Sequence, residues 1–160
     1  MISESTPIEW TVAAQIYALA QAAYKLEAVL IGCVDFPPLR ESLNGLRDSP
    51  DRFLVFQEAG TIVGALSFHH SPEAVAVTRL VVSPAHQRKG IATALLADLE
   101  QRIHPVASLT VSTALHNTPA VSLYRKLGYA TERVSNSAEG IPLLHLTKCK
   151  ERNTECTASA

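Results

Sequence analysis

Residues 78–93 constrain this chain more than any other stretch, because they read TRLVVSPAHQRKGIAT. The apolar, β-branched run that ends at Val82 predicts a buried strand. Ser83-Pro84 stops that strand, since proline has no N–H to donate to a ladder. Gly90 then stands at the start of an Ala- and Leu-rich helix. A strand that leads through a short loop into a helix start predicts an anion site, because unpaired N–H groups and the helix dipole favour negative charge there.

The spacing within this loop narrows the choice of anion. Arg88 and Lys89 place two cations in it, but no G-K-[ST] follows and no G-x-G-x-x-G is present. Gln87-x-x-Gly90-x-Ala92 resembles the Q/R-x-x-G-x-G/A loop of the GNAT superfamily of N-acetyltransferases, which cradles the pyrophosphate of coenzyme A. The alternative is a helix start whose glycine only allows close packing.

A second segment, residues 117–129, reads NTPAVSLYRKLGY. It is similar to the later GNAT motif N-x-x-A-x-x-L-Y-x-K-x-G-[FY], and the two motifs occur in the family's order. The matching residues are Asn117, Ala120, Leu123, Tyr124, Lys126, Gly128 and Tyr129. The resemblance covers residues 50–148 well and the first 50 residues poorly.

Periodicity and turn residues predict the order of the elements. A helix begins with Thr6 as N-cap, Pro7 at its first position and Glu9 closing a capping box, and Gly32 breaks it. A short helical stretch follows Pro37-Pro38. Further strands are expected at 53–57, 61–68, 74–82, 108–113, 129–134 and 141–147, and further helices at 90–103 and 118–127. His104-Pro105 ends the first of these two helices.

The resemblance implies an α/β (α+β) fold of the GNAT type. Its central sheet is mixed, mostly antiparallel, with six or seven strands and about four flanking helices, and its central strands are splayed at the acyl-CoA site. The family usually opens with a short strand, for which the first residues leave little room. A nucleotide-binding α/β domain is excluded, because a meander of strands precedes the anion loop in place of repeated strand–helix units.

Composition sets the class of protein. At 160 residues, with 47% hydrophobic and 18% charged residues, the chain is expected to form a single domain over 1–148, with a frayed polar tail at 149–160. A net charge of −1 argues against nucleic-acid binding. Three cysteines without C-x-x-C suit a reducing compartment. With no signal peptide and no membrane-spanning run, the expected location is cytoplasmic.

Acetyl transfer from a thioester to an amine needs a held donor, a neutral amine, oxyanion stabilisation and a proton for the leaving thiolate. The resemblance implies acetyl-CoA as cosubstrate and no metal. The loop would hold the pyrophosphate, and the backbone of the preceding strand would pair with the pantetheine arm, one N–H near Val82 polarising the thioester carbonyl. The implied binding residues are Leu80, Val81, Val82, Gln87, Arg88, Lys89, Gly90, Ile91, Ala92, Thr93, Asn117 and Tyr124.

Tyr124 is the candidate general acid, because the family uses this tyrosine to protonate the thiolate. The other interpretation is a tyrosine that packs its helix against the sheet. Asn117 lies two helical turns earlier on the same face, where it would contact the pantetheine arm, cap the helix, or do both. Tyr129 is expected to be structural, and His86 a neighbour of the phosphates.

The general base stays unknown from the sequence. Members of the family carry a glutamate at one of two positions, which correspond here to Ala76, which cannot serve, and to Ser112. The remaining candidates are His69, His70, Glu73, Glu27 and Asp35. A chain of water molecules, or an amine that arrives neutral, would need no named base.

The acceptor is expected to be a small-molecule or peptide amine. Its site would lie between the first helix, residues 32–46 and the loop after Phe68, where Glu27, Asp35 and Glu41 could attract a cation or simply be surface acids. Asp35-Phe36-Pro37-Pro38 forms either a rigid wall or only a turn. Homodimers are common in the family, although no surface in this chain identifies one. The competing hypothesis is an inactive acyl-CoA-binding sensor or interaction module, which the missing glutamate favours and Tyr124 opposes.

Overall fold

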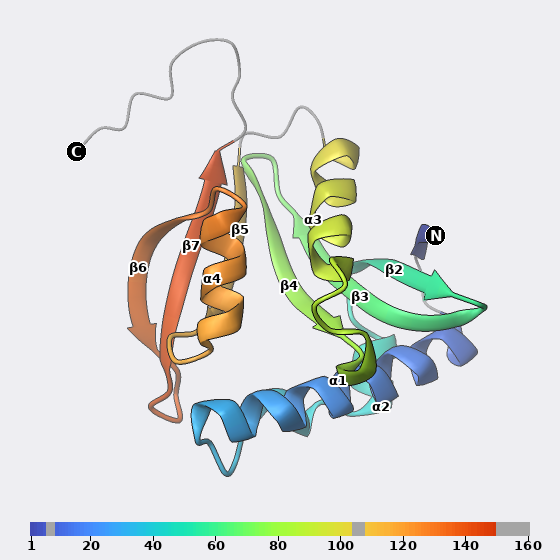
Figure 1. Cartoon of the computed structure of the whole chain (residues 1–160), viewed down its shortest axis with the longest axis horizontal. Helices are drawn as coiled ribbons and strands as arrows, with labels where there is room; N and C mark the ends of the chain where they lie inside the picture. The colour runs from blue at the N-terminus through green and yellow to red at the C-terminus, as the bar shows by residue number, and fades with distance from the viewer. Residues whose placement is uncertain (6–8, 104–107, 150–160) are drawn as a thin grey trace.

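A seven-stranded sheet with the order β1-β2-β3-β4-β5-β7-β6 runs through the molecule (Figure 1). The computed structural model describes residues 1–5, 9–103 and 108–149. Neighbouring strands are antiparallel except for β4 and β5, which are parallel. The strands are β1 (Ile2–Ser5), β2 (Arg52–Glu58), β3 (Thr61–His70), β4 (Ala74–Val82), β5 (Ser108–Ala114), β6 (Ala130–Asn136) and β7 (Pro142–Cys149). The predicted mixed, mostly antiparallel sheet is therefore confirmed.

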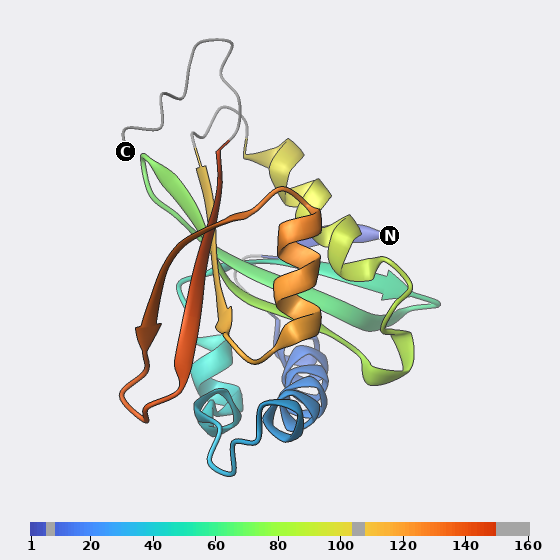
Figure 2. The ribbon, with the colours of Figure 1, turned by 60° about the vertical axis from the view of Figure 1, so that its left-hand side comes forward.

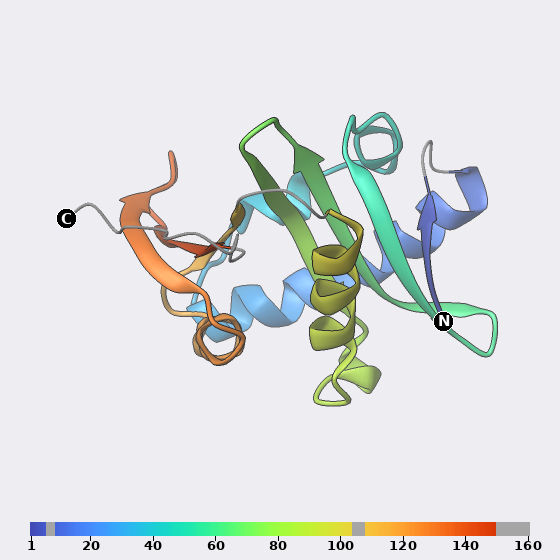
Figure 3. The same cartoon turned by 90° about the horizontal axis from the view of Figure 1, so that it is seen from above.

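Helices cover both faces of this sheet. The α-helices are α1 (Trp10–Ile31), α2 (Leu43–Arg47), α3 (Ile91–Arg102) and α4 (Thr118–Lys126), and short 3₁₀ turns lie at η1 (Pro37–Arg40) and η2 (Pro84–His86). Figures 2 and 3 show α3 and α4 on the same side of the sheet. None of the described helices is both long enough and apolar enough to cross a lipid bilayer.

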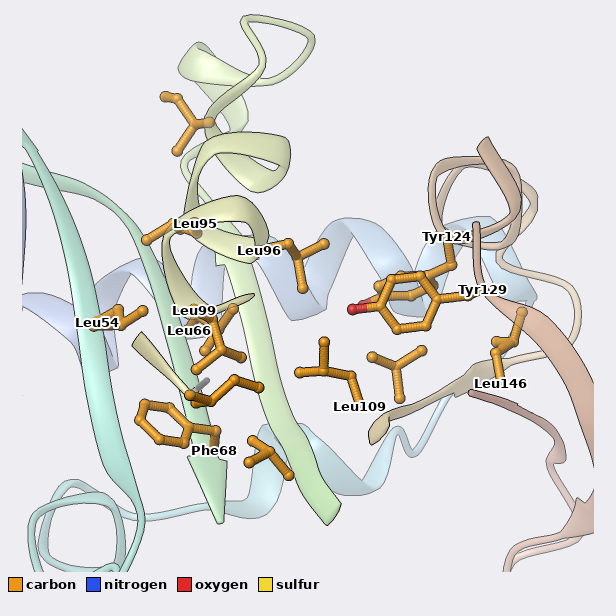
Figure 4. Close-up of a cluster of buried hydrophobic side chains, with 14 of the residues drawn as sticks. Leu54, Leu66, Phe68, Leu95, Leu96, Leu99, Leu109, Tyr124, Tyr129 and Leu146 are labelled. Atoms are coloured by element: carbon orange, nitrogen blue, oxygen red, sulfur yellow. The ribbon is translucent and has the colours of Figure 1, made fainter. Parts of the chain in front are cut away.

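The period-2 alternation of the strands builds a core on each face. Leu54 and Leu66 are fully buried beneath α3, together with Leu95, Leu96 and Leu99 of that helix. Figure 4 shows these leucines beside Phe68, Leu109, Tyr124 and Tyr129. The residues between them, such as Phe53 and Ala65, face the other way and pack with α1 and α2. Both helical layers are thus fixed by the same strands.

The start of α1 differs from the prediction. Thr6, Pro7 and Ile8 lie outside the described residues, but Glu9 has an extended backbone with ψ 151° and is itself the N-cap. The proposed capping box, which needs Glu9 inside the first turn, is therefore wrong. The reason is β1, which pairs with β2 through Ser5 and takes up residues ahead of the helix. The predicted break at Gly32 is confirmed, with φ 69° and a hydrogen bond from Cys33 N to Ala28 O of 2.9 Å.

Strands β4 and β5 pair over a short stretch and then diverge (Figure 1). The parallel ladder runs only from Ala74 opposite Ser108 to Val77 opposite Val111. The next residue of β4, Thr78, is the extra residue of a bulge, because β3 pairs Ser67 with Arg79 and Phe68 with Val77. A bulge bends its strand and increases the local twist. It therefore accounts for the separation of the two strands, which the family resemblance predicted.

Candidate functional site

Two adjoining cavities lie where β4 and β5 diverge. The larger cavity has a volume of about 470 Å³ and the smaller cavity about 300 Å³. The larger is lined by Ala23, Leu26, Glu27, Leu30, Leu80, Val81, Val82, His86, Gln87, Arg88, Gly90, Ile91, Ala92, Thr93, Asn117, Pro119, Ala120, Leu123 and Tyr124. The smaller is lined by Tyr24, Glu27, Phe36, Pro37, Pro38, Thr78, Arg79, Leu80, Ser112, Thr113, Ala114, Asn117, Ala120, Tyr124, Ser137, Glu139, Ile141 and Leu143. The residues common to both, Glu27, Leu80, Asn117, Ala120 and Tyr124, form the seam between the cavities.

The loop before α3 gives the larger cavity an anion-binding end. Arg88 and Gly90 both have left-handed backbones, with φ 63° and 78°. Alternating backbone conformations of this kind turn successive N–H groups toward one point. The first turn of α3 adds more donors, because the bond from Ala94 N to Gly90 O is the first within the helix and no side chain caps Gly90. A side chain placed on Gly90 would find open space, so the cradle is unobstructed.

Two basic side chains of this loop line the same cavity. Arg88 lines it directly, whereas Lys89, which the resemblance also implied, does not. His86 pairs through Nε2 with Glu58 at 3.1 Å, and its buried Nδ1 has no hydrogen-bond partner within the described part of the chain. Donors, cations and an unpartnered ring nitrogen therefore gather where a phosphate group would lie.

Beyond the loop, the larger cavity follows the end of β4. Leu80, Val81 and Val82 line it, and they lie beyond the last ladder pair with β5. Their hydrogen bonds to β3 occupy only one side of the strand. The edge of β4 that faces β5 can thus accept an extended ligand as an added strand.

Helix α4 carries Asn117 and Tyr124 to the seam. Asn117 is the N-cap, and its Oδ1 accepts a hydrogen bond from Ala120 N at 3.3 Å. Seven residues later on the same face, Tyr124 is 6% exposed and packs edge-on against Tyr129, with ring centroids 5.5 Å apart. Asn117 therefore caps the helix and Tyr124 packs against a neighbour, as their structural interpretations predict. Their position at the seam leaves a chemical role open to each as well.

Burial raises the pKa values of the tyrosines around the seam. The pKa of Tyr124 is raised by burial and further by the nearby Glu27 and Tyr24. Burial also raises the pKa of Tyr24 to about 12, although Arg79 partly opposes the shift. Both phenols therefore stay protonated at neutral pH, as a proton donor to a thiolate must.

Glu27 reaches the seam from α1. Its carboxyl is half-buried, and burial raises its pKa, while a hydrogen bond from the Asn117 side chain opposes the rise. Of the predicted base candidates, it is the one that lines a cavity. Asp35 is exposed and pairs with Arg40. His69 and His70 end β3, Glu73 lies in the turn before β4, and none of the three lines either cavity. Ala76 lines neither cavity.

The smaller cavity is lined by a partly buried arginine, Arg79, whose ion pairs the sequence did not reveal. Arg79 lies over the ring of Phe53 and pairs with Glu41 and Asp51, and its Nη1 bonds Ser67 Oγ at 3.1 Å. All of its donor groups are thus directed at this chain's own acceptors. Only the strand pairing of β4 with β3 brings these segments together, so sequence spacing could not signal it.

At the mouth of the smaller cavity, Arg40 joins two distant segments. It bonds Asp35 at 2.5 Å and Glu139, in the loop between β6 and β7, at 3.3 Å. Phe36 and Pro37-Pro38 line the cavity just inside, as the predicted rigid wall would. On the exposed side of β5, Ser112 Oγ lies 2.7 Å from Nδ1 of His145, whose Nε2 lies 2.7 Å from Ser135 Oγ.

The predicted short helix after Pro37-Pro38 is interrupted. η1 and α2 are separated by Glu41, which has an extended backbone with ψ 128°. That break directs Glu41 to Arg79. The apolar stripe of Ala23, Leu26 and Leu30 along the larger cavity was not among the residues predicted from sequence. Among the described residues, no three His, Cys, Asp or Glu side chains gather into a metal-binding group.

Comparison with known proteins places this site in context. A family model described as "Acetyltransferase (GNAT) family" matches residues 13–129. The UPF0157 protein YqkA of Bacillus subtilis (strain 168) is 34% identical over 135 residues. The match covers 84% of this chain but only 39% of YqkA, so the chain corresponds to less than half of that relative.

Solved structures share the fold at low sequence identity. The ribosomal-protein-S18-alanine N-acetyltransferase of Escherichia coli superimposes with a TM-score of 0.70 at 18% identity, over 98% of each chain. An aminoglycoside 6′-N-acetyltransferase in complex with coenzyme A gives a TM-score of 0.69 at 16% identity, covering 93% of this chain and 96% of the other. At such identities these neighbours establish the fold.

Proposed function

Because the chain belongs to the acetyltransferase (GNAT) family, an acyltransferase family, we propose that it transfers an acetyl group from acetyl-CoA to a primary amine. The acceptor would be a small molecule or a peptide, and the amine would attack the thioester directly. The observation that carries this proposal is the seam, where Tyr124 and Asn117 face two cavities at once. One cavity ends at an anion cradle, and the other opens on the opposite side of Tyr124.

The residues of the larger cavity fit acetyl-CoA. The pyrophosphate would accept hydrogen bonds from the N–H groups of residues 87–93 and face the Arg88 guanidinium. The free edge of residues 80–82 would pair with the amide-bearing arm of the donor. A volume of about 470 Å³ is in the range of ordinary ligand sites.

Tyr124 would supply the proton for the leaving thiolate. Its phenol is buried at the seam, and its raised pKa keeps it protonated. A backbone N–H near Val82 would polarise the thioester carbonyl and stabilise the oxyanion that forms on attack. The smaller cavity would hold the amine, with Phe36 and Pro37-Pro38 as one wall.

Calorimetric titration with acetyl-CoA tests this function, followed by thiol release against a panel of primary amines in the same preparation. Binding together with amine-dependent thiol release is the expected result. Binding without release under any amine would favour the alternative, an acyl-CoA-binding sensor module. Absence of binding would overturn the assignment of the loop before α3 as the cofactor site.

A further inference from the structure

Glu27 is a carboxylate in an unusual position. It lines both cavities at the seam, and its side chain is half-buried between them. Its neighbours along the same face of α1, Ala23 and Leu30, are apolar. Among the described residues, no Lys, Arg or His side chain forms an ion pair with it. Glu139, the other acid that lines the smaller cavity, is paired with Arg40, whereas Glu27 is left for a cation that comes from outside.

The position of Glu27 is controlled by the helix that carries Tyr124. Asn117 Oδ1 accepts from Ala120 N, so its amide group is left to donate, and it lies close enough to the Glu27 carboxyl to oppose the rise of that group's pKa. One end of the Asn117 side chain thereby caps α4 and the other holds the carboxylate. Asn117 is therefore a neighbour of Glu27 at the seam and belongs to the same helix as Tyr124.

We propose that Glu27 is the general base, which accepts the proton that the acceptor amine loses during acetyl transfer. This inference rests on the proposed function. The amine nitrogen forms a bond to the carbonyl carbon of the thioester, and the carbon–sulfur bond breaks with its electron pair going to sulfur. Tyr124 gives its proton to that sulfur, and Glu27 takes one proton from the nitrogen. Transfer of a proton from Glu27 to Tyr124 then restores both groups, leaving an amide and a free thiol.

The charged and titratable groups around Glu27 fit this role. Tyr24 lies one turn earlier on α1, Tyr124 faces it from α4, and His86 and Arg88 line the larger cavity from the loop before α3. Arg79 of β4 and Glu139 of the loop between β6 and β7 line the smaller cavity, each already paired. Burial raises the pKa of Glu27, and a carboxylate that binds its proton more tightly is the stronger base.

One other arrangement could accept a proton within the smaller cavity. Ser112 occupies a position where family members carry a glutamate, and it bonds His145. This pair lies on β5 and β7 and lines only the smaller cavity, through Ser112, while Glu27 shares the seam with Tyr124. Glu27 is therefore the better placed, and Ser112→Ala becomes a comparison in the test.

The test uses two amines of similar size, ethylamine and 2,2,2-trifluoroethylamine, with the wild type and Glu27→Gln. Ethylamine is protonated at pH 7.5, so it must first lose one proton to Glu27, which releases it to solvent, before the transfer described above. Trifluoroethylamine is largely neutral and loses only the proton of the transfer itself. We expect Glu27→Gln to lower kcat/KM for ethylamine about 100-fold. The loss should be at least about tenfold smaller for trifluoroethylamine. Glu27→Asp should recover part of the activity.

Two further measurements distinguish a chemical role of Glu27 from a structural one. Calorimetry should give Glu27→Gln the wild-type Kd for acetyl-CoA, because glutamine can still accept the bond from Asn117. Carboxyl ¹³C NMR of the ligand-free protein should place the titration of Glu27 above the usual range of a glutamate, its resonance being assigned by its loss in the Gln variant. Glu73→Gln, which changes the same group away from both cavities, should leave the kinetics unchanged.

Each remaining outcome decides against the proposal. An active wild type with equal losses for both amines, or no loss, would overturn Glu27 and leave the proposed function standing. Suppose that Ser112→Ala, and not Glu27→Gln, lowers kcat/KM more for ethylamine than for trifluoroethylamine. That result would assign the role of base to Ser112 and His145. A wild type that binds acetyl-CoA but acetylates neither these amines nor the panel would overturn the proposed function, and the role of Glu27 with it.

Discussion

Single residues at the seam serve structure and chemistry together. Asn117 caps α4 with one atom and holds Glu27 with another, and Tyr124 packs against Tyr129 while its phenol faces two cavities. A side chain fixed by several contacts is pre-organised, because its rotamer is set before any ligand binds. Substitutions that spare the packing therefore isolate the chemical role.

Tyr124→Phe removes the phenol oxygen and keeps the ring. We expect turnover to fall about 10- to 100-fold, because the leaving thiolate loses its proton donor. Calorimetry should give nearly unchanged affinity for acetyl-CoA. Tyr129→Phe is the matched control, since its buried hydroxyl has no hydrogen-bond partner within the described residues and should contribute little. Similar turnover in both variants would remove Tyr124 from the acid role.

Glu27→Gln should also change the dependence of stability on pH. Because burial raises the pKa of Glu27 in the folded state, that state binds its proton more tightly than the unfolded state does. Stability is therefore lost as pH rises from the unfolded pKa through the raised one, and the loss persists above it. At pH 7 the Gln variant should melt at a higher temperature than the wild type, by calorimetry, and the difference should shrink at acid pH. A lower melting temperature at pH 7 would contradict this account.

At the scale of elements, the loop before α3 combines backbone shape with charge. Gly90→Asp places a negative charge in the anion cradle, so we expect acetyl-CoA binding to be lost in calorimetry. Gly60→Asp is a close control, because Gly60 has the same φ of 78° and equally open space but lies in the turn between β2 and β3. Both variants carry similar backbone strain. Equal loss of binding in both would show that strain, and not charge at the cradle, was responsible.

Most elements could be predicted from local patterns, and the exceptions have physical causes. β4 begins and ends at the predicted residues, and the predicted span of α3 is correct to within a residue at each end. The bulge at Thr78 was not predictable, because it exists only in the register between β4 and β3. Glu41 interrupts the predicted short helix because Arg79 engages it from another part of the chain.

Most residues that line the loop end of the larger cavity could be predicted from sequence, and the rest of the candidate site could not. The motif spacing predicted these residues because an anion cradle would be built from contiguous backbone. Of the predicted residues, Lys89 alone does not line the larger cavity. The base could not be selected, because Glu27 meets the seam only when α1 crosses beside α4, which no local pattern specifies.

At the scale of the whole molecule, the sheet consists of two parts, β1–β4 and β5–β7, joined by a ladder of four residue pairs. A ligand that lies between the parts should hold them together. With acetyl-CoA at 100 times its Kd, mass action contributes about 2.7 kcal/mol. We expect the melting temperature to rise by about 5–10 °C. Gly90→Asp should lose this rise, and amides of residues 80–82 should become protected from hydrogen exchange in the wild type only.

The divergence of β4 and β5 leaves two unsatisfied strand edges in the middle of a sheet, where most proteins have none. Such an edge presents main-chain donors and acceptors, which every amino acid except proline supplies equally. Substitutions at residues 80–82 that keep an extended backbone would preserve it. A protein built around such an opening could exchange nearly all of the surrounding side chains and retain the same main-chain edge.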